Sequence, residues 1–400
     1  MALESKVKWY SHAMAGIPAQ STSYSNTAGK CVELLDAVLV DGFNLVSVDS
    51  IVVNNNVATL TRSAGMTFLL DQVIEIAGAT PSALNGQWRV ASVSAGTNSL
   101  TFVTSGISNQ TATGTITCKT PSLGWERVFT ATNKRVYRSQ NEDSPRSYYR
   151  IDDTVVSSNQ NGGMISAYGI MTDIDTGSEN WMPQSSTNPC WVIPRNYGTE
   201  FLIVGDDRTA NLVLRGLWAN NSITFGNVYG FGDFASFKPN DQKNEVLTSF
   251  GGSGSANGIG NSILTAIGWS TFSNGGCRIR QGVNGVSGAR ADGVSNIGVV
   301  LSGYGGLPFP AAVDNNIVVT DALIREEGAG GNPVRGKMRG VYWCMSNVPL
   351  ATQWGPQFVS GVVGLEGRVC AVMPLIGPSS GSDFTPRTGR VLLDIYGPWE

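Results

Sequence analysis

The most constraining feature of the sequence is a regular succession of short apolar segments between residues 47 and 118. The segments are Val48–Val53, Val57–Thr61, Gln72–Ile76, Gln87–Val93, Ser99–Val103 and Gly114–Cys118. Asn- and Gly-rich turn signals separate them, so that a new strand is expected about every 8 to 15 residues. Short strands at this spacing are typical of a small β-sandwich or barrel.

One turn signal in this region is especially informative. Asn85 and Gly86 both tolerate positive φ angles and suit a tight turn that leads into the segment Gln87–Val93. We therefore expect Trp88, which follows the turn directly, to anchor a small core.

The same region resembles a known group of proteins. The stretches 78–90, 99–102 and 110–117 are similar to the small immunoglobulin-like β modules that are inserted in tail and virion proteins of tailed bacteriophages. Further motifs in the order 124–129, 149–154, 231–234, 364–368 and 394–399 resemble phage virion proteins of about this length. The resemblance implies a structural part of a virion.

The segments on either side of this region indicate an insertion. Residues 38–44 and 122–129 read as if they continue each other, each with a Gly-aromatic turn, and insertions are tolerated at exposed loop tips whose ends are close. We predict an inserted immunoglobulin-like β module over 47–118. The host domain then comprises 1–46 and 119–400 and can be divided further near 250–306.

The host domain is predicted to be mainly β and sandwich-like, with few helices. Lys30–Val40 is the best helix candidate, although its apolar positions mix helical and strand spacing. The Gly-aromatic repetition of 227–234 indicates a bulged, sharply turning chain. The Gly-, Ser- and Asn-rich stretch 251–306 is predicted to be a long flexible surface excursion.

Composition excludes several classes of function. Charged residues make up only 14% of the chain, against about 25% in typical soluble proteins, and the basic residues form no run that would bind nucleic acid. No apolar run is long enough for a membrane helix, and the N-terminus lacks the apolar core of a signal peptide. We expect neither nucleic-acid binding nor membrane insertion, and synthesis in a bacterial cytoplasm.

The cysteine and histidine inventory argues against metal and disulfide frameworks. The six cysteines lie far apart without any C-x-x-C pair, and His12 is the only histidine. Buried, reduced thiols are the expected outcome. Because a nucleophile triad needs a base, which is usually a histidine, an isolated His12 does not indicate one.

Paired acids are the remaining candidates for chemistry. A glycosidase needs two carboxylates that flank one sugar bond. Successive residues of a strand point to opposite faces, so adjacent acids are better explained by turns at strand ends. The pairs interpreted in this way are Asp152 with Asp153 and Asp206 with Asp207, and Glu326 with Glu327 is a further candidate pair.

The acids Asp173 and Asp175 are different, because residues two apart on a strand share a face. A divalent cation could bridge them with Thr176 or Glu179, although the spacing matches no EF-hand loop. They are kept as weak metal candidates. We expect no catalytic residue, cofactor site or enzymatic activity, and the glycine-rich stretch 252–258 has the wrong spacing for a nucleotide fingerprint.

Aromatic residues leave room for surface recognition, since flat rings can stack on sugars. Trp125, Trp191, Trp343 and Trp399 are flanked by apolar strand residues, and we expect them in the core or in subunit contacts.

These observations favour a structural protein of the tailed-phage virion, in the tail or baseplate. It would act through subunit interfaces with itself, as a cyclic homo-oligomer, and with other virion proteins. One alternative is a minor capsid or head decoration protein. The other is an adhesin or depolymerase that acts on a host-surface glycan.

Overall fold

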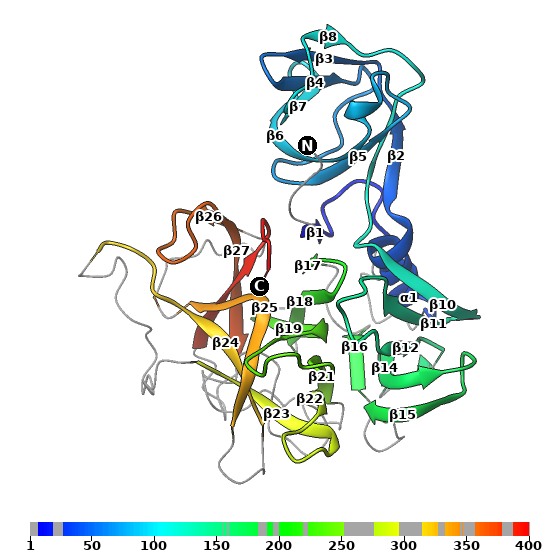
Figure 1. Ribbon diagram of the computed structural model, residues 1–400, viewed down its shortest axis with the longest axis vertical. Helices are drawn as coiled ribbons and strands as arrows, with labels where there is room; N and C mark the ends of the chain where they lie inside the picture. Colours follow the sequence, from blue (N-terminus) through cyan, green and yellow to red (C-terminus); the bar gives the residue numbers. More distant parts are fainter. Residues whose placement is uncertain are drawn as a thin grey trace.

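The chain forms two separate β-sheets, one of eight strands and one of 20 strands, in a computed structural model (Figure 1). The structure describes residues 7–18, 27–154, 156–157, 160–182, 190–194, 200–218, 223–251, 276–295, 314–326, 333–344, 346, 357–377 and 387–399. Its helices are α1 (Lys30–Leu35), the π-helix η1 (Asp36–Asp41) and the 3-10 helix η2 (Ser82–Leu84) within this part. The prediction of a mainly β protein with few helices is confirmed.

The eight-stranded sheet, here called the module, lies between two segments of the rest of the chain, the host. Its strands pair antiparallel in the order β2-β9-β5-β6-β7-β4-β3-β8. The strands are β2 (Phe43–Ser47), β3 (Ser50–Asn54), β4 (Val57–Thr61), β5 (Val73–Ala77), β6 (Gly86–Ser94), β7 (Ser99–Val103), β8 (Gln110–Thr111) and β9 (Thr117–Thr120). β2 and β9 extend this unit beyond the predicted 47–118.

A bend in β6 folds the module's sheet around its own core. The first half of β6 pairs with β5 and the second half with β7, with a register shift between Val90 and Ser92. Trp88 is buried in this core, where its indole Nε1 donates to the carbonyl of Leu84 at 2.8 Å. The expected role of Trp88 is confirmed.

The turn before Trp88 differs from the prediction. Asn85 is extended, with φ −74°, and only Gly86 has a positive φ. The Asn85 side chain instead accepts from the Ala79 backbone N at 2.8 Å and donates to the Ala79 carbonyl at 2.9 Å. The Asn85 side chain thus pairs with the Ala79 backbone as a neighbouring strand would. The chain changes direction in η2 and not at Asn85.

The two chain crossings between host and module lie side by side. The backbone N of Leu123 donates to the Val38 carbonyl at 2.8 Å, and that of Gly124 to Leu39 at 3.2 Å. β2 and β9 continue this pairing into the module, where Phe43 faces Thr120.

The predicted helix over Lys30–Val40 is confirmed and has two parts, α1 and η1. In the π-helical part the backbone N of Gly42 donates to the carbonyl of Ala37, five residues earlier, at 2.9 Å. This wider winding explains why the apolar positions do not keep a helical period. The helix begins where the Asp153 carboxylate accepts from the backbone N of Cys31 at 2.9 Å.

The host strands form one long antiparallel system. Its main path is β1-β17-β18-β19-β21-β22-β23-β24-β25-β28-β27-β26, and a branch β10-β11-β12-β14-β16 joins β21. The strands are β1 (Lys8–Ser11), β10 (Trp125–Ala131), β11 (Lys134–Ser139), β12 (Tyr148–Asp152), β13 (Val156–Ser157), β14 (Gln160–Met171), β15 (Gly177–Met182), β16 (Cys190–Pro194), β17 (Phe201–Gly205), β18 (Thr209–Trp218), β19 (Ile223–Asp233), β20 (Ala235–Ser236), β21 (Glu245–Gly251), β22 (Gly276–Gln281), β23 (Ser287–Ser295), β24 (Val319–Glu326), β25 (Val334–Cys344), β26 (Gln357–Ser360), β27 (Val369–Gly377) and β28 (Arg387–Asp394).

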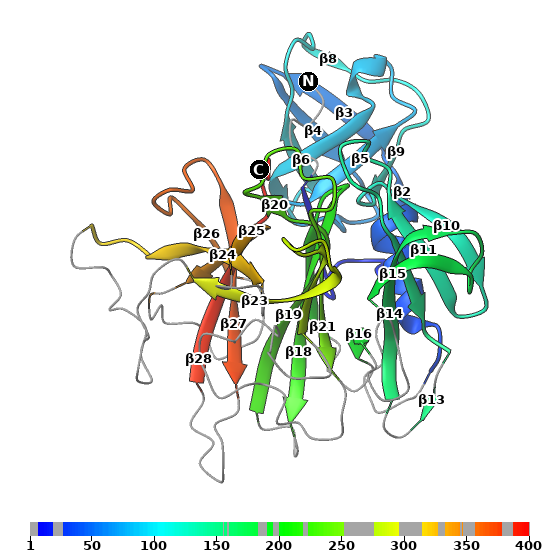
Figure 2. The same cartoon turned by 60° about the horizontal axis from the view of Figure 1, so that its bottom comes forward.

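The host sheet curls so that distant strands share one core. β27 packs against β19, although many strands separate them along the sheet (Figure 2). Trp125, Trp343 and Trp399 are buried in this core, as expected from their apolar neighbours. The side chain of Trp191 lies outside the described part.

The four cysteines whose side chains the structure describes are not joined in disulfides. Cys31, Cys118 and Cys370 are buried, and Cys344 is half-buried. Burial raises the pKa of the Cys370 thiol to about 12, so this thiol is inert at neutral pH. The side chains of Cys190 and Cys277 are not among those described.

Two predictions about glycine-rich segments are wrong. Residues 276–295 form the paired strands β22 and β23 instead of a flexible excursion, whereas 252–275 and 296–313 lie outside the described residues. Residues 227–233 belong to β19, which pairs with β18 in unbroken register. A Cβ at Gly232 would meet the Arg208 carbonyl at 2.2 Å, so the glycine permits close strand approach and not a bulge.

Among the described residues, no helix has the length and apolar character needed to cross a membrane.

Candidate functional site

The two weak metal candidates are not on a strand. Asp173 and Asp175 lie in the turn between β14 and β15, so they do not share a strand face. The Asp175 carboxylate accepts from Lys134 Nζ at 2.9 Å and from the Arg150 guanidinium. These hydrogen bonds hold the pKa of Asp175 below its usual value, and the bond from Lys134 has the largest effect.

Other acids near this turn are also engaged by cations. Glu179, the third possible ligand, lies 3.4 Å from the Arg280 guanidinium. In the part of the chain that the structure describes, no three His, Cys, Asp or Glu side chains gather as a metal site. The predicted common strand face of Asp173 and Asp175 was wrong because β14 ends at Met171, before both acids.

In two of the adjacent pairs one acid acts in a strand-end turn, as predicted. Asp152 accepts from the backbone N of Thr154 at 3.1 Å. Asp206, at the end of β17, accepts from the backbone N of Arg208 at 2.9 Å and of Thr209 at 2.8 Å. Each carboxylate therefore closes its own turn.

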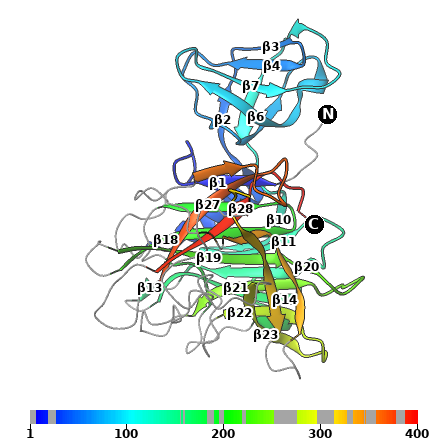
Figure 3. The ribbon, with the colours of Figure 1, turned by 90° about the vertical axis from the view of Figure 1, so that its left-hand side faces the viewer.

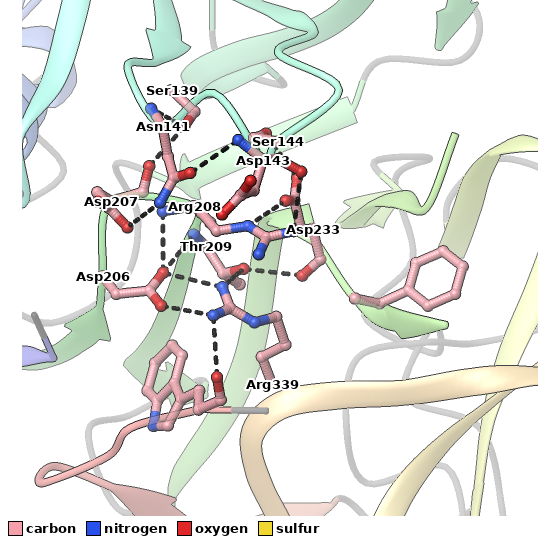
Figure 4. A network of polar contacts seen from close by, with 12 residues as sticks. Ser139, Asn141, Asp143, Ser144, Asp206, Asp207, Arg208, Thr209, Asp233 and Arg339 are labelled. Carbon is pink, nitrogen blue, oxygen red and sulfur yellow. Dashed lines mark hydrogen bonds and ion pairs between the residues drawn. The ribbon is translucent and has the colours of Figure 1, made fainter. Parts of the chain in front are cut away.

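Asp206 is also the centre of a buried charge network (Figure 4). Arg339 of β25 reaches it with a nitrogen-to-oxygen distance of 2.8 Å, and the two side chains are each 7% exposed. The same guanidinium donates to Thr209 Oγ1 at 3.1 Å and to the Trp399 carbonyl at 3.2 Å. Arg339 thereby joins the β17–β18 turn to the C-terminal segment.

A second ion pair lies beside the first. Arg208 Nε donates to the Asp233 carboxylate at 2.7 Å, and Ser144 Oγ donates to the same carboxylate at 2.9 Å (Figure 4). Thr209 Oγ1 donates to the Asp233 carbonyl at 2.8 Å. Asp233, at the end of β19, thus fastens the loop before β12 to the β17–β18 turn.

A third ion pair, between Glu245 and Arg280, places a second buried acid next to Asp233. Glu245 of β21 faces Asp233 directly in the strand register, and both are at most 1% exposed. Glu245 accepts from Arg280 at 2.7 Å and from the hydroxyl of Ser147 at 2.7 Å. The two acids are therefore balanced by two arginines, Arg208 and Arg280.

Burial and this neighbour change the ionisation of Asp233. Burial, together with the nearby Glu245 charge, raises the pKa of Asp233 to about 7 despite the Arg208 ion pair. A carboxyl group with this pKa could hold or release a proton near neutral pH. Because Asp233 is 0% exposed, its proton would serve the fold and not a bound substrate.

The remaining candidate residues that the structure describes are also held by contacts within the host. Glu326 is buried and lies 3.0 Å from Arg335, while Glu327 is outside the described residues. His12 follows β1 and packs edge-on against Phe201, with ring centroids 6.3 Å apart. None of these side chains is brought to the Asp206 network.

Sequence reasoning did not find Asp233, Glu245 or Arg339 as partners. Asp206 and Arg339 are separated by 133 positions, and no spacing rule joins them. The only available signal is weak: a chain with few charges places several of them on apolar strands, where a charge must be paired.

A second polar cluster fixes the module on the host. Arg89 of β6 donates to the Asp71 carbonyl at 2.9 Å and to the Val7 carbonyl at 3.1 Å. Its guanidinium stacks on the Tyr396 ring, 4.3 Å from the centroid. We call Arg89, Asp71 and Tyr396 the junction clamp.

The clamp is closed by hydrogen bonds to Asp71 from the host. The Tyr396 hydroxyl donates to the Asp71 carboxylate at 2.6 Å, and Trp9 Nε1 donates to the Asp71 carbonyl at 3.0 Å. Burial, and then the bond to Asp71, raise the pKa of Tyr396 to about 12, so this hydroxyl remains a donor at neutral pH. The clamp thus fixes the orientation of the module.

Replacing Arg89 with alanine is expected to loosen this junction. Loss of two hydrogen bonds and the stacking contact costs about 1–2 kcal/mol of local stability. Trypsin cleavage after Lys119, which lies at the crossing, should become roughly 5- to 30-fold faster. Arg62→Ala is the control, since the Arg62 guanidinium donates to the carbonyls of Ala64 and Gly65 in its own loop; equal acceleration in both variants would refute the clamp.

Comparison with models of known protein families finds no match, and comparison with curated proteins finds none either.

Proposed function

We propose that the chain is a structural component of a tailed-phage virion, placed in the tail or baseplate, and that it acts through subunit interfaces in a symmetric assembly. The observation that carries this proposal is the structural role of the charged side chains. The acids described above are tied into turns and cross-strand ion pairs of a rigid sheet. Such a use of charge supports a building block more than a catalyst.

The architecture supports the same proposal. A small β module is mounted on a larger β host by two adjacent chain crossings and the junction clamp. A fixed module suits repeated subunits, because identical contacts around a symmetry axis need an identical orientation in every copy. The resemblance of residues 47–118 to phage immunoglobulin-like modules points to the same setting.

Mass spectrometry of purified particles tests the proposal directly. Virions of the phage that encodes this chain should contain it at a fixed copy ratio that survives washing in high salt. Its absence from particles would refute the virion role. Electron microscopy of the same particles would then separate the tail from the alternative position on the head.

A further inference from the structure

The strands of the outer half of the module carry no charge. Strands β3, β4, β7 and β8 lie at the end of the module that points away from the host (Figures 1 and 3). Residues 50–61 and 90–118, which contain all four strands, include no Asp, Glu, Lys or Arg. About one residue in four is charged in typical soluble proteins, so a neutral surface of this extent is unusual.

The exposed side of these strands is a regular face of β-branched side chains. Val57 of β4 pairs with Val103 of β7, and these side chains are 39% and 65% exposed. The next outward row pairs Thr59 with Thr101, and Val52 of β3, 41% exposed, stands opposite Thr59. We call these five residues the tip face.

The neutrality of the tip face follows from position and not only from composition. The module does contain charged residues, but they lie on its other parts. Asp71 and Arg89 are in the junction clamp, while Glu75 and Lys119 form an ion pair between β5 and β9. Asp49 and Arg62 flank β3 and β4 where Ser50 pairs with Thr61, at the opposite end of β4 from the Val57–Val103 pair. Charge is thus excluded from the tip face itself.

The free surface at the tip is the face of the sheet and not its edge. The edge strand β8 has only two residues, Gln110–Thr111, and short edge strands limit pairing with another sheet. The face, by contrast, exposes three valines without a covering element. A partner would therefore pack on the face, as in sheet-on-sheet contacts.

We propose that the tip face binds the tip face of a second copy of this chain. A charged partner would lose hydration against a surface that offers it no counter-charge, so the fitting partner is itself neutral. The tip face meets that condition, and β-branched rows can interdigitate across a two-fold axis. The proposal deepens the assembly role proposed above and rests on it.

A neutral glycan is the less favoured occupant. Sugar-binding surfaces usually present exposed aromatic rings on which sugars stack. The outward positions of β3, β4 and β7 instead hold valine, threonine, serine and asparagine, and the aromatic ring of Phe102 points into the core.

Sedimentation equilibrium of the full chain over a range of concentrations tests the proposal. The wild type should dimerise with a dissociation constant of about 1–100 µM. Val103→Lys should raise this constant at least tenfold, because two ammonium groups would be brought together without counter-charges. Val103→Thr, which stays neutral and β-branched, should dimerise within a few fold of the wild type.

Val363→Lys is the matched control, since Val363 is 54% exposed on the host. It should leave the dissociation constant unchanged. A wild type that stays monomeric up to about 1 mM overturns the proposal, including the case in which it binds a neutral polysaccharide such as dextran instead. An equal effect of Val363→Lys would also overturn it. Finding the chain in particles would then still leave the assembly role standing, so the two proposals fail separately.

Discussion

Replacing Arg339 with methionine is expected to lower the free energy of unfolding by about 3–5 kcal/mol. The substitution removes the cation that balances Asp206 in an environment where both side chains are buried. Methionine fills a similar volume, so the loss reports the stranded carboxylate more than a cavity. Urea unfolding followed by circular dichroism measures the change.

Arg138→Met is the matched control for this result. Arg138 pairs with Glu126 at 2.6 Å, but the two side chains are 23% and 31% exposed. Water solvates the carboxylate that remains, so the expected loss is about 0–1 kcal/mol. Similar losses in the two variants would mean that the Arg339 ion pair does not hold the β17–β18 turn to the C-terminal segment.

The strands of the module were predictable because their signals are local. Alternation places Ile51 and Val53 inward on β3, and Ala58 and Leu60 inward on β4. The asparagines between these strands adopt positive φ angles and close the hairpin. Period-two patterning and turn chemistry are both contained in about ten successive residues, so a sequence alone can reveal them.

The arrangement of the host could not be predicted in the same way. β1 pairs with β17, so Lys8 faces Gly205, and β27 packs on β19. Such contacts depend on how the whole sheet curls, which no short window encodes. Glycines in β19 were misread for a related reason, since their closest neighbours come from another strand.

The candidate site shows the same difference between local and long-range contacts. That Asp206 closes a turn follows from its place at a strand end, and this was predicted. That Arg339 neutralises it follows only from the fold, because the pair is 133 positions apart. Asp173 and Asp175 were predicted as metal candidates because their spacing does not reveal that Lys134 of β11 and Arg150 of β12 bind Asp175.

The interior of the host and the tip of the module therefore differ in how they use charged residues. Inside the host, buried ion pairs fix which strands and turns meet, because an unpaired buried charge is costly and tolerates few alternatives. At the tip of the module, charge is absent where a partner is proposed to bind. A rigid host with a neutral contact surface is consistent with the proposed assembly role.

Asp233→Asn is expected to change how the stability of the protein depends on pH between about 4 and 7. The folded state raises the pKa of Asp233 from 3.8 to about 7, chiefly by burial. The folded protein therefore holds a proton that the unfolded chain has released across this window. The contribution of Asp233 to the free energy of unfolding therefore falls as pH rises from 4 to 7, and levels off above 7.

The size of this effect follows from the pKa values. A rise from 3.8 to about 7 corresponds to roughly 4 kcal/mol lost across the window. Asparagine cannot ionise, so urea titrations of Asp233→Asn should lack this decline. Asp175→Asn is the control of opposite sign: the Lys134 and Arg150 bonds lower the pKa of Asp175, so its stabilising contribution is constant above about pH 4 and is lost only below that pH, and this variant should keep the decline between pH 4 and 7. Equal changes in stability between pH 4.5 and 7.5 in the wild type and in Asp233→Asn would show that Arg208 compensates the buried charge of Asp233 completely.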